Sequence, residues 1–151
     1  MPVEKLKTFL EKNDIPYISI KHSPAYTAQE IAAKAHIPGQ ELAKTVIVKI
    51  DKKLAMVVLT SAARVNLQWM KKELSADSVE LATEQEFKTK FPECETGAMP
   101  PFGNLWGMNV YVSQTLTNDR MIAFNGGSHS ELIQCSYKDF QKAVHPTVLN
   151  F

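Results

Sequence analysis

The stretch that decides the fold is residues 45–60, TVIVKIDKKLAMVVLT. Its two apolar runs, 45–50 and 54–60, flank the polar Asp51-Lys52-Lys53 and predict a β-hairpin. The second run is apolar on both faces, so we expect a central strand that is covered on both sides. The apolar segment 54–59 is far shorter than the roughly 20 residues needed to span a bilayer, so no membrane association is expected.

Further elements are expected on both sides of this hairpin. Helical spacing of apolar residues predicts helices at 3–13, 28–35, 66–74, 83–91 and 137–144, the second of which begins at a capping box of Thr27 and Glu30. Apolar runs between turn residues predict strands at 17–20, 79–81, 109–112, 121–124 and 132–136. Because helices and strands do not alternate regularly, we expect a mixed α+β fold instead of a doubly wound parallel sheet.

Length and charge limit the classes of protein to be considered. The 151 residues, 44% of them hydrophobic, predict one compact domain over residues 1–151. A net charge of +1 does not indicate that the whole surface binds nucleic acid, so any contact with nucleic acid must be local. The basic residues that could provide it, or could equally be ordinary solvated surface charges, are Lys44, Lys49, Lys52, Lys53, Arg64, Lys71, Lys72 and Arg120.

Cysteine and histidine usage favours a reducing compartment and disfavours metal chemistry. Cys94 and Cys135 form no Cys-x-x-Cys pattern, and the N-terminus lacks the layout of a signal peptide, so a cytoplasmic location is expected. The four histidines show no ligand spacing to one another or to the cysteines, so we expect neither a metal nor a cofactor. A Cys94–His129 nucleophilic pair is disfavoured, since nothing indicates an activated thiolate.

Lys44 is the most informative single residue. Strand alternation places it in one row with Val46, Val48 and Ile50. A lysine at the head of an apolar row either extends from the strand end to water or stands in a cleft whose floor is the sheet. In the second case its ammonium group is a fixed charge that can stabilise an oxyanion or a phosphate.

Two glycine-containing loops are the other candidate features. The stretch 97–103, GAMPPFG, combines stiffening prolines with glycines that permit close backbone approach by a ligand. The stretch 125–130, NGGSHS, is longer and more polar than a tight hairpin needs, and His129 could serve as an acid or base. Either stretch could also be a purely structural connection, with His129 an ordinary surface histidine.

Four stretches together resemble the YbaK and prolyl-tRNA synthetase associated domain family. They occur in the family order and cover nearly the whole chain: HSPAYTAQE at 22–30, AKTVIV at 43–48, GAMPPFG at 97–103 and GGSHSELI at 126–133. The resemblance implies one α+β domain with a curved, mixed and mainly antiparallel sheet flanked by helices. It also implies a trans-acting aminoacyl-tRNA deacylase, a hydrolase that cleaves the ester of a mischarged tRNA.

The resemblance further assigns roles to residues. Lys44 matches the key lysine of the family and is the expected catalytic residue. The expected substrate-binding residues border the aminoacyl group from the two loops: Gly97, Ala98, Met99, Pro100, Gly126, Gly127, Ser128 and His129. The expected partner is the acceptor end of a tRNA, with tRNA-Pro carrying Ala, Cys or Ser as the favoured substrate. The alternative is a noncatalytic binding module for an aminoacyl or nucleotide-like ligand; a synthetase partner and the oligomeric state stay open.

Overall fold

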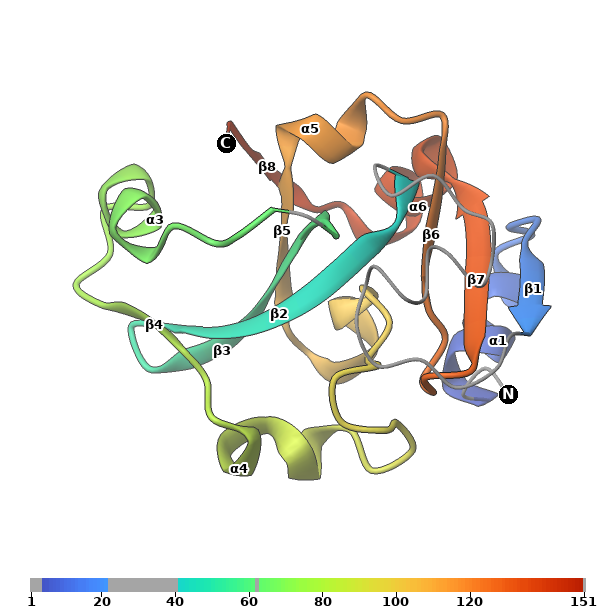
Figure 1. Cartoon of the computed structure of the whole chain (residues 1–151), viewed down its shortest axis with the longest axis horizontal. Coiled ribbons are helices and arrows are strands. Elements are labelled where there is room, and N and C mark those ends of the chain that lie inside the picture. Colours follow the sequence, from blue (N-terminus) through green and yellow to red (C-terminus); the bar gives the residue numbers. More distant parts are fainter. Residues whose placement is uncertain (1–3, 22–40, 62, 151) are drawn as a thin grey trace.

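The β2–β3 hairpin is the centre of the fold, as the sequence predicts. A computed structural model describes residues 4–21, 41–61 and 63–150, and Figure 1 shows their arrangement. Strands β2 (Ala43–Ile50) and β3 (Lys53–Thr60) pair antiparallel, from Ala43 opposite Thr60 to Ile50 opposite Lys53. Asp51 and Lys52 both have positive φ angles, 49° and 71°, which is the backbone of a two-residue type I′ turn.

Five strands form the larger sheet, in the order β4-β2-β3-β5-β8. Strand β4 (Val79–Leu81) is antiparallel to β2, whereas β5 (Asn109–Ser113) lies parallel to β3 and β8 (Thr147–Leu149) parallel to β5. Strand β3 therefore lies in the middle, and residues 55–59 are all buried. The prediction of a central strand covered on both sides is confirmed.

Three strands form a second, fully antiparallel sheet, in the order β1-β7-β6. They are β1 (Ile18–Lys21), β7 (Glu131–Ser136) and β6 (Met121–Asn125). A parallel bridge between Leu42 and Ala123 joins this sheet to the chain just before β2. The α+β fold with a mixed, mainly antiparallel sheet is confirmed.

Helices contribute to both core clusters, which lie on opposite faces of the larger sheet. Helix α1 (Glu4–Lys12) and helix α6 (Tyr137–Val144) contribute Leu6, Leu10 and Phe140 to the main core cluster, which also holds Ile47 of β2. On the opposite face, helix α3 (Leu67–Glu73) packs Met70 into a second cluster with buried residues of β2 and β3. None of the helices in the described ranges has the length and apolar character needed to cross a bilayer.

Local differences from the predicted elements have physical causes. The predicted helix 83–91 is only α4 (Glu84–Phe87) followed by the 3₁₀ turn η2 (Lys88–Lys90), because Phe91 leaves the helix to pack against Trp106 at 4.8 Å between ring centroids. Three short elements were not predicted: α5 (Gln114–Thr117), η3 (Gly103–Trp106) and β8. The predicted helix 28–35 and its capping box lie outside the described residues.

Candidate active site

Lys44 stands at the head of an apolar row on the α3 face of the larger sheet. It pairs with Leu59 across the hairpin, and Val46, Val48 and Ile50 below it all belong to the second core cluster. Ile47, between them, points into the main cluster on the other face. The alternation that the sequence predicts for this strand is therefore observed.

The ammonium group of Lys44 lies in a positive environment. Burial lowers the pKa of Lys44 below its usual range, and the nearby charge of Arg64 lowers it further. The hairpin register explains the proximity, because Arg64 follows the end of β3 while Lys44 begins β2. The side chain of Lys44 forms no hydrogen bond or ion pair with the residues that the structure describes.

The two glycine-containing loops are joined directly by hydrogen bonds. The amide of Glu95 donates to the carbonyl of Gly127 at 2.7 Å, and the amide of Gly127 donates to the carbonyl of Ala98 at 3.0 Å. The amide of His129 donates to the Glu95 carboxylate at 2.9 Å. Residues 95–98 and 127–129 therefore form one unit, which we call the loop clasp.

The His129 ring belongs to the loop clasp. Its Nε2 lies 2.9 Å from the carbonyl oxygen of Thr96, and since a carbonyl can only accept, Nε2 carries the proton. Gly97 has a φ of 86° and Gly127 a φ of 108°, so both occupy backbone conformations that side chains disfavour. These contacts give His129 a positioning role for the two loops.

The 97–103 loop faces the protein interior with its side chains. Ala98, Met99 and Phe102 are 0%, 4% and 0% exposed, and Met99 and Phe102 belong to the main core cluster. Gly103 is required by this packing, because an added Cβ would lie 2.7 Å from Cγ2 of Val110. A ligand that approaches this loop can therefore contact its backbone groups more readily than it can contact the buried Met99 side chain.

Strand β6 is the element that connects the region of Lys44 to the loop clasp. An isolated parallel bridge joins Leu42, two residues before Lys44, to Ala123 of β6, and β6 ends at Asn125, the residue before Gly126. The side chains of Met99 and Phe102, however, pack on the face of β2 opposite the Lys44 row. The two loops are therefore joined to each other by hydrogen bonds. Among the described residues, no hydrogen bond joins either loop to the side chain of Lys44.

Sequence reasoning did not single out Arg64 and Asn125 at this site. Arg64 appeared only as one of several scattered cations, although its position just after the strand opposite Lys44 was a usable signal. The Oδ1 atom of Asn125 is buried, with no hydrogen-bond partner in the part of the chain that the structure describes. Its position directly before the Gly126-Gly127 pair was the corresponding signal.

The environment of Cys94 is relevant to the alternative in which Cys94 and His129 form a nucleophilic pair. Burial raises the pKa of Cys94 to about 12, with the charge of Glu93 acting in the same direction. A thiol of this kind is not an activated nucleophile. No group of three potential metal ligands is found within residues 4–21, 41–61 and 63–150.

The chain belongs to the aminoacyl-tRNA editing domain family, whose sequence model matches residues 22–143. This match confirms the family resemblance that the four stretches indicate.

Relatives and solved structures support the same grouping. The chain is 29% identical over 99 residues to a proline–tRNA ligase of Geobacillus sp. (strain WCH70), covering 64% of this chain and 17% of the relative. It is 32% identical over 75 residues to that of Bacillus cereus (strain AH187), covering 50% and 13%. The matched part thus spans less than a fifth of these relatives.

Two solved structures share the fold across nearly the whole chain. The hypothetical protein APE2540 has a TM-score of 0.87 at 22% identity, covering 97% of this chain and 98% of its own. A proposed trans-editing enzyme for prolyl-tRNA synthetase has a TM-score of 0.82 at 17% identity, covering 97% and 93%.

Proposed function

We propose that the chain is a trans-acting aminoacyl-tRNA deacylase, with residues 1–151 forming one editing domain. The observation that carries the proposal is the half-buried ammonium group of Lys44, unpaired among the described residues, in a chain of the editing family. A fixed positive charge of this kind stabilises a developing oxyanion. A tRNA-related function is also consistent with a cytoplasmic location.

The proposed reaction is hydrolysis of the ester between an amino acid and the terminal ribose. Water attacks the ester carbonyl carbon, the carbonyl oxygen becomes an oxyanion, and the ribose oxygen leaves with a proton. Lys44 supplies positive charge, and backbone groups of the loop clasp position the aminoacyl group. A ribose hydroxyl of the substrate assists proton transfer, since the site residues provide no evident general base.

The proposed substrate is tRNA-Pro carrying a small amino acid such as Ala, Cys or Ser. The relatives named as proline–tRNA ligases support this choice of tRNA. A pocket discriminates one methylene by only about 1 to 3 kcal/mol, so overlapping activity on these three esters is expected. The acceptor end of the tRNA is the partner, and association with a synthetase belongs to the same proposal.

The substitution Lys44→Ala tests the proposal at the residue that carries it. We expect the hydrolysis rate to fall by about a hundredfold to a thousandfold, as when one oxyanion-stabilising donor is removed. Stability should change less than the roughly 2 to 5 kcal/mol of a core truncation, because Lys44 lies at a strand end. The measurement is single-turnover release of the amino acid, with thermal melting alongside.

Two further variants serve as controls for this measurement. Lys44→Arg should restore activity only in part, because the planar guanidinium places its donors differently. His129→Ala should lose less activity than Lys44→Ala, since His129 holds the loops together. A folded Lys44→Ala protein with a near-normal rate would remove Lys44 from the mechanism and favour the noncatalytic binding module.

A further inference from the structure

Within residues 4–21, 41–61 and 63–150, four cations on the α3 side of the larger sheet have no acidic partner. Lys44, Arg64, Lys71 and Lys72 form no ion pair in the part of the chain that the structure describes. Lys49, by contrast, contacts Glu80 at 3.2 Å and also pairs with Glu86. An unneutralised group of cations favours binding of an anion or polyanion.

Three of these cations, Arg64, Lys71 and Lys72, line two hollows beside α3. The first has a volume of about 720 Å³, and its lining includes Arg64, Asn66, Gln68 and Lys71. The second has a volume of about 620 Å³ and includes Asn66, Gln68, Lys71 and Lys72. The hollows share three lining residues, so they lie next to each other along α3, and we refer to the two together as the α3 groove.

Glu80 is the acidic residue that lines the first hollow. Its carboxylate lies 3.2 Å from Lys49, which it shares with Glu86, so Lys49 offsets only part of the negative charge of Glu80. The uncharged side chains of Asn66 and Gln68 add hydrogen-bonding groups between the cations. The groove therefore combines the cations Arg64, Lys71 and Lys72 with neutral polar groups, and has one carboxylate at its β4 edge.

Arg64 connects the groove to Lys44. Helix α3 packs through Met70 against Val48 and Leu59, on the same face of the sheet as the Lys44 row. Arg64 lies next to Lys44 and lines the near end of the groove. Figure 1 shows α3 following the end of β3 and lying beside β4, at the side of the molecule away from β6 and β7.

We infer that Arg64, Lys71 and Lys72 bind the sugar-phosphate backbone of the RNA helix that leads away from the aminoacyl end held at Lys44. The inference rests on the proposed function, because that function places the aminoacyl end at Lys44. Phosphate contacts of this type position a nucleic acid without reading its sequence. They also explain how a chain with a net charge of only +1 can bind RNA locally.

The test compares charge-removing variants in binding to uncharged tRNA. We expect Lys71→Gln/Lys72→Gln and Arg64→Gln to bind more weakly, measured by fluorescence anisotropy over a range of salt concentrations. The slope of log affinity against log salt should become shallower by about 0.7 to 0.9 for each phosphate that the variant no longer neutralises. Thermal melting confirms that each variant is folded.

The matched control is Lys88→Gln/Lys90→Gln. It removes the same charge from η2, which lies between Phe87 and Phe91 of the opposite core cluster. The control should keep the wild-type affinity and salt slope. An unchanged slope in Lys71→Gln/Lys72→Gln, or an equal change in the control, overturns the inference, as does a wild-type protein that does not bind tRNA.

A short substrate separates this inference from the proposed function. An aminoacyl-adenosine ester lacks the RNA helix, so Lys71→Gln/Lys72→Gln should hydrolyse it at the wild-type rate while losing activity on the full tRNA; Arg64→Gln is left out of this comparison because Arg64 lies beside Lys44. If the wild-type protein hydrolyses neither substrate but the groove variants still change the salt slope, the proposed function fails and the RNA-binding surface stands.

Discussion

Two glycines of the 97–103 loop are needed for different physical reasons. Gly97 has a φ of 86°, but an added Cβ would meet only the His129 ring, at 3.6 Å. At Gly103 an added Cβ would lie 2.7 Å from Val110 and 2.9 Å from the carbonyl of Met108. Backbone conformation is therefore the constraint at Gly97, and space is the constraint at Gly103.

This difference predicts that alanine and asparagine substitutions rank in opposite order of stability at Gly97 and at Gly103. Gly97→Ala should cost about 1 to 2 kcal/mol for the left-handed conformation, and Gly97→Asn less, because asparagine tolerates that conformation. Gly103→Ala should cost about 1 to 3 kcal/mol through overpacking, and Gly103→Asn more. Urea unfolding measures all four variants, and the same ranking of alanine and asparagine at both positions would refute this explanation.

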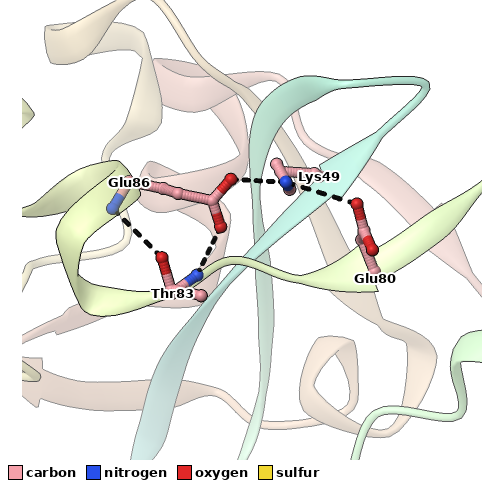
Figure 2. Close-up of polar contacts among 4 residues, drawn as sticks. All are labelled: Lys49, Glu80, Thr83 and Glu86. Carbon is pink, nitrogen blue, oxygen red and sulfur yellow. Dashed lines mark hydrogen bonds and ion pairs between the residues drawn. The ribbon is translucent and has the colours of Figure 1, made fainter.

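At the scale of single elements, Lys49 connects three segments of the chain. Figure 2 shows it between Glu80 of β4 and Glu86 of α4, with which it forms ion pairs. Thr83 and Glu86 form a capping box, in which the Thr83 amide donates to Oε1 of Glu86 at 2.8 Å. The hydrogen bond from Lys49, supported by that from the Thr83 backbone, lowers the pKa of Glu86 to about 2.

The lowered pKa of Glu86 predicts a pH dependence of stability. A carboxylate with a depressed folded-state pKa contributes stability above its unfolded value, here 4.5, and loses it as the pH falls toward 2. Glu86→Gln should therefore be less stable than wild type at neutral pH, with the difference shrinking between pH 4.5 and about 2. The measurement is the urea midpoint across this range.

The control for the pH dependence is Glu84→Gln. Glu84 lies in the first turn of the same helix but makes none of the contacts drawn in Figure 2. Its variant should keep the wild-type dependence of the urea midpoint on pH. A difference between Glu86→Gln and wild type that stays constant from neutral pH to pH 2 would contradict the assigned role of Glu86.

Elements set by local sequence were predictable, and those set by distant contacts were not. The hairpin follows from alternation and a polar turn, and Asn66 caps α3 where helical spacing begins. Phe87 and Phe91 lie four residues apart and their rings do contact each other, at 6.4 Å between centroids, but Phe91 lies outside the helix and also packs against the distant Trp106. Strand β8 has only three residues, and it is defined by its pairing with the distant β5.

At the scale of the whole molecule, the sequence predicted the parts of the candidate site better than their arrangement. Lys44 follows from strand alternation, and the two loops follow from their glycines. The loop clasp between Glu95 and Gly127 depends on how the 95–98 turn packs on the β6–β7 connection, which no local pattern specifies. The groove along α3 likewise requires the hairpin register that places Arg64 beside Lys44.

The most direct test of the central claim is release of amino acids from a panel of mischarged tRNA-Pro by the full chain. We predict fast hydrolysis of Ala, Ser and Cys esters, with overlap among them because small side chains are weakly discriminated. Esters of Pro and of a bulky aromatic residue should be hydrolysed much more slowly. If the protein binds these tRNAs without accelerating the release of any amino acid, or removes the aromatic residue as fast as alanine, the assignment as an editing deacylase for small amino acids is contradicted.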